Sequence, residues 1–281
     1  MQKIWVCGAR GQIGQAVNDV VDKLEFEMLD TDVDDLDVTD TDEVLRFGEM
    51  NRPDIIINCS GMTDISSCEE NPSQAFKVNA LGARNLAIVA AKMQAKMVQL
   101  STDDVFDGKS TEPYTEFDIT NPGTVYGKSK LAGENYVKEF TTKHFIVRST
   151  WVYGKGQNFI NGFLKKVDAG EQLSIASDQF GSPTSANELA RFLLHLVHTS
   201  EYGTYHATNK GVCSRYAFAQ EILKMTGKTA SMQPVPTVMS DFSKVRPAYA
   251  VLDNFIMSMV PIYDFPDWQD SLREYLEERG L

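Results

Sequence analysis

Short apolar runs alternate with longer amphipathic stretches along the first half of the chain. The run at 54–58 (Asp-Ile-Ile-Ile-Asn) is apolar almost throughout, which is typical of a strand covered on both faces of a sheet. Strands that alternate with helices predict a parallel sheet with right-handed crossovers. The predicted fold class is therefore α/β, with a doubly wound parallel sheet of the Rossmann type and a smaller C-terminal lobe. The predicted strands are 4–7, 26–29, 54–58, 97–100 and 145–147, and the predicted helices are 13–24 and 80–92.

The pattern becomes less regular after about residue 149. Helical stretches are separated there by segments rich in Gly, Pro and Ser. These stretches are 159–169, 187–198 and 214–225. We predict a first domain over residues 1–150 and a lobe over residues 151–281. The segment near 187–210 is expected to pack back onto the first domain.

Composition and charge narrow the classes of function. Of the 281 residues, 42% are hydrophobic and 23% are charged, as in an ordinary globular chain. No apolar run of about 18 residues occurs, and the first apolar run ends at Gly8, so we expect neither a membrane span nor a secretory leader. Lys and Arg number 27 against 39 Asp and Glu, and this net charge of −12 disfavours nucleic acid as a partner.

Cysteines and histidines give no sign of a metal or disulfide framework. The four cysteines form no C-x-x-C pair and are too few to staple a small fold. We interpret them as reduced thiols of a cytoplasmic protein. The four histidines share no ligand spacing, so no metal site is predicted.

Residues 30–43 are strongly acidic. A calcium loop would need a glycine at its sixth position, and this stretch contains none. We interpret the stretch as a solvated loop after the second strand, with Asp30 set apart as a candidate cofactor ligand.

A glycine-rich turn joins the first predicted strand to the first helix. Gly8, Gly11 and Gly14 form a G-x-x-G-x-x-G run there. Glycine permits a tight turn and lets the backbone approach a pyrophosphate, while the helix N-terminus offers N–H groups and partial positive charge. The motif predicts a dinucleotide site over residues 8–14.

Asp30 ends the predicted second strand. A carboxylate at that place can hydrogen-bond the adenine ribose hydroxyls and disfavours the 2′-phosphate of NADP. Arg10, inside the glycine loop, could offset this by pairing with a phosphate. The predicted cofactor is therefore NADPH or NADH, with the preference open.

Tyr126 and Lys130 stand at positions i and i+4, on one face of a predicted helix that runs to about residue 140. The pair lies downstream of Ser101-Thr102-Asp103, which ends a predicted strand, and strand ends are where α/β proteins bind ligands. These residue types suit carbonyl reduction, in which the oxyanion forming on the substrate needs a proton.

A phenol with a pKa of about 10 needs about 4 kcal/mol of differential stabilisation to approach neutrality. A nearby ammonium supplies this by favouring the phenolate. We therefore predict Tyr126 as proton donor, Lys130 as its electrostatic partner and Thr102 as a hydrogen-bond donor to the carbonyl oxygen.

Together these residues resemble the extended short-chain dehydrogenase/reductase superfamily. Within it, the chain is similar to the dTDP-4-dehydrorhamnose reductase family over nearly its full length. The segments that carry the resemblance are 8–14, 53–58, 78–80, 101–103, 105–108, 126–134, 151–154, 158–159, 178–184, 246–247 and 252–253. The resemblance implies NAD(P)H-dependent reduction of the 4-keto group of dTDP-4-dehydro-L-rhamnose to dTDP-L-rhamnose.

The resemblance also implies roles for individual residues. The implied catalytic residues are Thr102, Tyr126 and Lys130, and the implied substrate contacts are Thr102, Asp103, Trp151 and Arg246. The implied cofactor contacts are Gly8, Arg10, Gly11, Gln12, Ile13, Gly14, Asp30, Asp37, Val38, Gly61, Met62, Thr63, Asn79, Tyr126 and Lys130. The implied partner is a dTDP-linked 4-keto-6-deoxyhexose, bound by a monomer or homodimer.

Four positions depart from the family pattern. Asp104 stands where an aromatic residue is usual, Met62 where Tyr or His is frequent, and Ser66 where Asp is frequent. Gln15 replaces a glutamate that helps some members to form a magnesium-bridged dimer, so again no metal is predicted. Three alternatives stay open: another nucleotide-linked keto sugar, a non-catalytic regulatory subunit like that of animal methionine adenosyltransferase, and epimerisation or dehydration.

Overall fold

Six parallel strands form the central sheet of the protein. The structure, a computed structural model, describes residues 1–239 and 248–281. In that part of the chain the sheet has the order β10-β5-β4-β3-β1-β2, and every neighbouring pair is parallel. The predicted doubly wound α/β fold is confirmed. The strands are β1 (Gln2–Cys7), β2 (Phe26–Thr31), β3 (Ile55–Asn58), β4 (Lys96–Thr102), β5 (His144–Ser149) and β10 (Gly203–His206).

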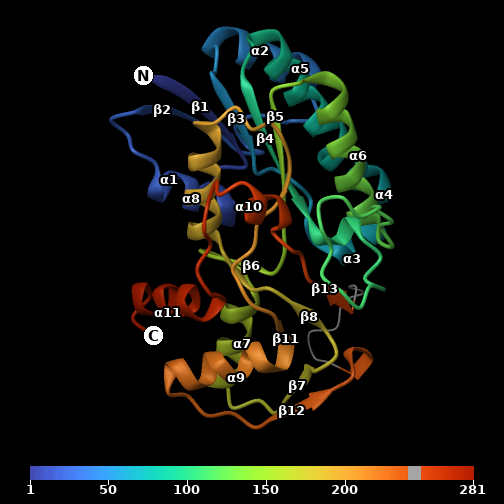
Figure 1. Ribbon diagram of the computed structural model, residues 1–281, viewed down its shortest axis with the longest axis vertical. Coiled ribbons are helices and arrows are strands. Elements are labelled where there is room, and N and C mark those ends of the chain that lie inside the picture. Colours follow the sequence, from blue (N-terminus) through green and yellow to red (C-terminus); the bar gives the residue numbers. More distant parts are fainter. Residues whose placement is uncertain (240–247) are drawn as a thin grey trace.

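Both faces of this sheet are buried, which explains the continuous apolar runs. On β1, Ile4 and Val6 belong to the core on one face, while Trp5 and Cys7 belong to the core on the other. All four side chains are fully buried. Helices α1 (Gln12–Val20) and α8 (Ala186–Val197) cover the first face, and α2 (Thr41–Asn51), α5 (Ala83–Met93) and α6 (Val125–Phe140) cover the second (Figure 1).

Two helices differ from their predicted bounds. Helix α1 stops at Val20, because the Asp22 carboxylate accepts the N–H of Leu24 and the Asp22 carbonyl accepts that of Phe26. These bonds form a turn where a further helical turn was predicted. The helix predicted from residue 80 begins as a π-helical turn, η1 (Lys77–Gly82), which α5 continues.

The sixth strand comes from the second half of the chain. Strand β10 pairs in parallel with β5, with Tyr205 opposite Val147. Helix α8, which precedes β10, packs against α1. Lys96 on β4 donates from Nζ to the carbonyl oxygens of Val197 and Thr199, at 2.7 Å each, and so satisfies the C-terminal end of α8. Strand β10 and the end of α8 therefore contact strands of the N-terminal half.

A smaller lobe lies below the end of the sheet in Figure 1. Its core gathers Tyr153, Phe163, Ile175, Phe218 and Leu272. Its helices are α7 (Phe159–Asp168), α9 (Arg215–Thr226) and α11 (Trp268–Glu278). Its short strands pair as β6 (Val152–Tyr153) with β9 (Thr184–Ser185), β7 (Leu173–Ala176) with β12 (Met232–Val235), and β8 (Phe180–Gly181) with β11 (Cys213–Ser214) and β13 (Tyr249–Ala250).

Short elements complete the described chain. They are α3 (Ile65–Glu70), α4 (Pro72–Phe76), the 3-10 turns η2 (Asp103–Val105) and η3 (Thr237–Met239), and α10 (Phe255–Met259). Among the helices of residues 1–239 and 248–281, none combines the length and apolar character that a membrane crossing requires.

The core under α8 gives a test of the packing. Phe192 is fully buried among residues of α8 and β10, whereas Phe117 is 70% exposed. We expect Phe192→Ala to lower the free energy of unfolding by about 3–5 kcal/mol, because a cavity remains where the ring was. The matched change Phe117→Ala should cost less than about 0.5 kcal/mol. Urea denaturation of both variants measures the difference, and equal losses would contradict this account of the core.

Candidate functional site

The glycine loop packs tightly against the ends of β1 and β3. Gly8 has a φ of +76°, and a Cβ there would lie 2.7 Å from the backbone N of Ser60. A Cβ on Gly14 would lie 2.3 Å from the Gly8 carbonyl oxygen. Both positions therefore require glycine. Helix α1 begins directly after Gly11, and within residues 1–239 and 248–281 no side chain caps its first N–H groups, so these can bind an anion.

Asp32 provides the carboxylate that accepts a hydrogen bond from the glycine loop. Strand β2 runs to Thr31, further than predicted, so Asp30 lies within the strand with an exposed side chain. Asp32 Oδ2 accepts the backbone N–H of Arg10 at 2.8 Å, which fastens the glycine loop to the end of β2. The sequence did not single out Asp32, because the predicted strand was too short and Asp30 was taken as its end. Asp32 could have been found as the acidic residue that directly follows the true end of β2.

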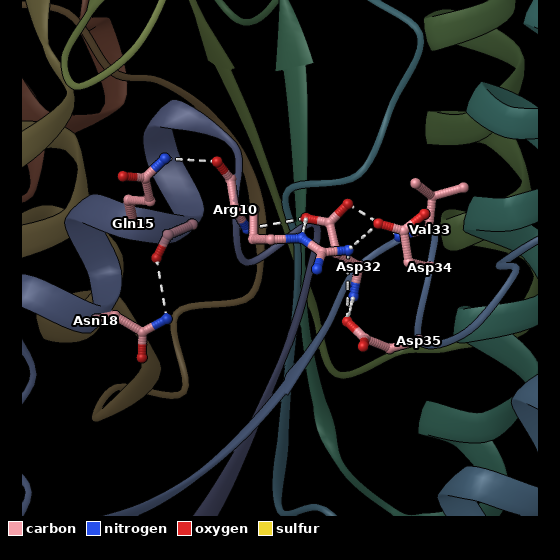
Figure 2. A network of polar contacts seen from close by, with 8 residues as sticks. Arg10, Gln15, Asn18, Asp32, Val33, Asp34 and Asp35 are labelled. Carbon is pink, nitrogen blue, oxygen red and sulfur yellow. Dashed lines mark hydrogen bonds and ion pairs between the residues drawn. The ribbon is translucent and has the colours of Figure 1, made fainter.

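Arg10 binds three carboxylates of the acidic stretch, as Figure 2 shows. Its Nη2 lies 3.0 Å from Asp34 Oδ2 and 3.6 Å from Asp35 Oδ2. Its Nε lies 3.9 Å from Asp32 Oδ2. The backbone carbonyl of Arg10 accepts the side-chain amide of Gln15 on α1 at 2.5 Å. The acidic stretch is thus more than a solvated loop, because part of it holds the arginine of the glycine loop.

A cavity of about 420 Å³ opens beside the glycine loop. Its lining comes from the segments that follow β1, β2 and β3. Strands β2 and β3 lie on opposite sides of β1, and such a switch in strand order is where doubly wound folds bind ligands. Of the predicted cofactor residues, those that line the cavity are Gly8, Gly11, Asp37, Val38, Gly61 and Met62, and Asp32 joins them.

The other predicted cofactor residues lie outside this lining. Gln12 donates from Nε2 to the carbonyl of Gln157 at 2.9 Å, and so links α1 to the smaller lobe. Ile13 packs against the core under α1, and Thr63 is exposed. Buried Asn79, on the π-helical turn, holds the Met62 backbone at both N–H and carbonyl, at 2.8 and 2.9 Å. It therefore shapes the cavity wall through Met62.

Thr102 and Tyr126 lie on two elements, β4 and α6, that contact each other. Thr102 is the last residue of β4, and its Oγ1 donates to Asp103 Oδ1 at 3.0 Å. Tyr126 lies in the first turn of α6, which Thr124 caps by accepting the N–H of Gly127 at 2.9 Å. A Cβ on Gly127 would lie 2.0 Å from the Asp104 carbonyl oxygen, so glycine brings α6 close to the end of β4.

Lys130 lies one helical turn after Tyr126 and is 5% exposed. Its Nζ would lie 3.7 Å from a Cβ at Gly61, which places the ammonium at the wall of the cavity. Burial lowers the pKa of Lys130 to about 8, although the Glu134 carboxylate and the Cys59 thiol raise it. Lys130 is not among the described lining residues of the cavity, but its Nζ lies next to Gly61, which is one of them.

A buried ion pair holds α6 against the sheet. Glu134, one turn beyond Lys130, is fully buried and accepts from Arg148 Nε at 2.9 Å and Nη2 at 2.8 Å. Ser101, next to Thr102 on β4, donates to the same carboxylate at 2.5 Å. Glu134 carried no role in the sequence analysis, yet its position four residues after Lys130 put it on the same helix face.

His206 completes this network as a neutral group. Its Nδ1 lies 2.9 Å from the Tyr114 carbonyl and 3.1 Å from that of Asp253, and its Nε2 faces Arg148 Nη1 at 3.5 Å. Burial, followed by the positive charge of Arg148, lowers the pKa of His206 to about 3. The histidine is therefore neutral near pH 7: its Nδ1 donates to the two carbonyls, and its Nε2 accepts from Arg148.

The predicted substrate contacts are described in part. Trp151 has a φ of +47°, unusual for a residue other than glycine, and the guanidinium of Arg215 lies 3.4 Å from the centre of its ring. A Cβ on Gly181 would come within 2.6 Å of the same ring. A sugar therefore cannot stack on the ring face that Arg215 covers while Arg215 stays in place. Arg246 lies outside the described residues.

A second cavity of about 420 Å³ is lined almost entirely by residues from the C-terminal half of the chain. Its lining includes Ser182, Leu252 and Asp253, which belong to segments that carried the family resemblance. Neither Thr102 nor Tyr126 belongs to the described lining of either cavity.

Comparison with known proteins gives a consistent result over the whole chain. The family model described as RmlD substrate binding domain matches residues 1–280. The spore coat polysaccharide biosynthesis protein SpsK of Bacillus subtilis is 35% identical over 281 residues, with 100% of this chain and 99% of the relative covered.

Two solved structures match equally fully. A dTDP-4-dehydrorhamnose reductase from Clostridium acetobutylicum has a TM-score of 0.97 and 40% identity, with 100% of both chains covered. The dTDP-4-dehydrorhamnose reductase of Bacillus anthracis, solved in complex with NADP, has a TM-score of 0.96 and 35% identity, with 99% and 100% covered.

Breaking the buried Glu134–Arg148 ion pair should lower the free energy of unfolding far more than breaking an exposed ion pair such as Asp270–Arg273. Arg148→Met should lower the free energy of unfolding by about 3–5 kcal/mol, because it leaves the Glu134 charge buried without its main partner. Arg273→Met removes an exposed pair with Asp270 on α11 and should leave the urea midpoint nearly unchanged. Denaturation curves of the two variants test this, and a small loss in Arg148→Met would refute it.

Proposed function

Since the chain belongs to the dTDP-4-dehydrorhamnose reductase family, as the match over residues 1–280 shows, we propose that it reduces the 4-keto group of dTDP-4-dehydro-L-rhamnose to dTDP-L-rhamnose. NADPH or NADH would be the reductant. The observation that carries this proposal is the position of Lys130 Nζ, which joins the Tyr126 helix to the cavity beside the glycine loop.

The residues of the cavity fit a dinucleotide. The glycine loop leaves no room for a Cβ at Gly8 or Gly14, and the uncapped start of α1 can receive the pyrophosphate. Asp32 and Asp37 line the cavity where the adenosine part would lie, and Gly61 with Met62 would border it on the β3 side. When bound, the cofactor supplies the hydride that reduces the carbonyl carbon.

Tyr126 would donate the proton that the reduced oxygen requires. A phenol holds its proton too tightly at neutral pH, and a neighbouring ammonium favours the phenolate that remains. Lys130 supplies that charge and can also hold the nicotinamide ribose. Thr102, at the end of β4, would hydrogen-bond the carbonyl oxygen and orient it.

The remaining assignments follow the division of the chain. We propose that residues 1–150 form the cofactor domain and that residues 151–281 mainly bind the nucleotide-sugar, with Asp103, Trp151 and Arg246 as contacts. We further propose a monomer or homodimer. The four cysteines are all unpaired thiols, which fits a reducing compartment such as the cytoplasm.

A different keto sugar is the second candidate. Asp104 is 1% exposed and directly follows the Thr102–Asp103 pair, where an aromatic residue is usual in the family. A carboxyl in place of a ring changes both the shape and the charge near the sugar. Loss of NADH or NADPH absorbance with dTDP-4-dehydro-L-rhamnose tests the first candidate. Turnover only with other nucleotide-linked keto sugars would support the second, and no turnover with any of them would support a regulatory role.

The role of Tyr126 can be tested by removing one oxygen atom. We expect Tyr126→Phe to lower kcat at least about a hundredfold, because the proton donor is lost, while the Kd for the cofactor changes less than about twofold. Tyr136→Phe, a matched change further along α6, should keep the activity. Unchanged turnover in Tyr126→Phe would contradict proton donation by this residue.

The pKa of Lys130 predicts a pH limit. Below a pH of about 8 the lysine is charged and can stabilise the phenolate, and above it the charge is lost. The kcat/KM for the sugar should therefore fall with rising pH above about 8. Lys130→Met should abolish most activity yet raise the Tm by a few degrees, since the folded state no longer buries an ammonium.

Lys128→Met, at an exposed position of the same helix, is the control and should leave both the activity and the Tm unchanged. A lower Tm in Lys130→Met, or a flat rate profile up to pH 10, would contradict the assignment.

A further inference from the structure

A charged group beside the glycine loop, which reaches the cavity through Asp32, carries more negative than positive charge. Around Arg10 the carboxylates of Asp32, Asp34 and Asp35 all lie within 4 Å of guanidinium nitrogens. Figure 2 shows these side chains converging on the arginine from the segment that follows β2. One guanidinium therefore faces three carboxylates, which leaves a net charge of −2 in the group.

We propose that this group makes the protein select NADH over NADPH, with Asp34 and Asp35 as specificity-determining residues that keep Arg10 from a 2′-phosphate. The proposal rests on the proposed reductase function only for the position of the cofactor. The sequence left the preference open between Asp30 and Arg10, and the proposal assigns it to Asp34 and Asp35 instead of Asp30.

The group lies at the edge of the cavity where, under the proposed function, the adenosine part of the cofactor would lie. Asp32 both lines the cavity and accepts the backbone N–H of Arg10, so the arginine and the carboxylates share one edge. Asp32 is also fixed by its own turn, since its Oδ1 accepts the N–H of Val33 at 2.9 Å and its N–H donates to Asp35 Oδ2 at 3.0 Å. A ribose hydroxyl can donate to carboxylates held in this way.

A 2′-phosphate at the position of this ribose hydroxyl is disfavoured by the same carboxylates. It carries up to two negative charges and accepts hydrogen bonds without donating any, so it repels the carboxylates. To hold it, Arg10 would have to leave Asp34 and Asp35. The side chains of Arg10 and Asp34 are 56% and 82% exposed, so each contact is weak and screened by salt. The selection therefore comes from the summed charge and not from any single ion pair.

The NADP complex of the Bacillus anthracis relative shows that this fold can accept the phosphate. Selection against it in this chain must then lie in the chain's own residues around Arg10. Asp34 is the most informative position, because among the described residues its side chain forms a hydrogen bond and an ion pair with Arg10 alone.

Equilibrium binding tests the proposal without turnover. The Kd of NADH and of NADPH are measured by nicotinamide fluorescence with the full chain in low-salt buffer. We expect NADPH to bind at least about tenfold more weakly, with the ratio shrinking at high salt. In the double variant Asp34→Asn/Asp35→Asn the ratio should fall to within about threefold, because Arg10 is freed and the binding of NADPH tightens.

Two further variants distinguish a loss of charge near Arg10 from a general loss of charge or a change in the fold of the turn. Asp42→Asn removes the same charge at an exposed position in the first turn of α2 and should keep the wild-type ratio. Because Asp35 also accepts the N–H of Asp32, the single variant Asp34→Asn is measured as well, and it should give an intermediate ratio with that turn intact.

The ratio of the two Kd values distinguishes the possible outcomes. A wild-type ratio below about tenfold would overturn the proposal, because Arg10 would then serve the phosphate despite its carboxylates. A wild-type ratio that persists in both variants would overturn the role of Asp34 and Asp35. Failure of the reductase function would appear instead as cofactor binding with no consumption of any keto sugar.

Discussion

The buried pair of Glu134 and Arg148 is the interaction on which the arrangement of the site depends. A charge in the core is tolerated only when partners satisfy it, and Glu134 is satisfied by an arginine of β5 and a serine of β4. These contacts allow one register between α6 and the sheet. Tyr126 and Lys130 precede Glu134 at helical spacing, so the same register brings the phenol to the end of β4 and the ammonium to the cavity.

Local signals in the sequence predicted those parts of the protein that depend on neighbours along the chain. The glycine loop, the apolar runs of the sheet and the spacing of Tyr126 and Lys130 are of this kind, and the structure shows each at the expected element. The segment near 187–210 was expected to pack back onto the first domain, but its strand pairing and the buried ion pair were missed, because both depend on contacts between distant segments. Strand β10 pairs with β5 across more than fifty residues, and Arg148 meets Glu134 only because β5 lies under α6.

The roles of individual carboxylates in the acidic stretch 30–43 also could not be predicted from the sequence. Composition shows that it is charged, but it does not show which carboxylates are held in place. That choice follows from where β2 ends. The strand continues to Thr31, two residues beyond the predicted 26–29, and Asp32 then accepts the backbone N–H of Arg10. Asp40 in the same stretch caps α2 instead, by accepting the N–H groups of Asp42 and Glu43. Two aspartates eight positions apart therefore have different roles: Asp32 lines the cavity, and Asp40 caps a helix.

The late position of β10 has a consequence for synthesis of the protein on the ribosome. Strands β1 to β5 are complete at Ser149, but the open edge of β5 is covered only once His206 has been made. At translation speeds of about 5–20 residues per second, this interval lasts roughly 3–11 s. During that time the nascent sheet exposes an unpaired edge and the apolar surface that α8 will cover, which is the state most open to aggregation. The first domain therefore finishes folding only after part of the second lobe has been translated.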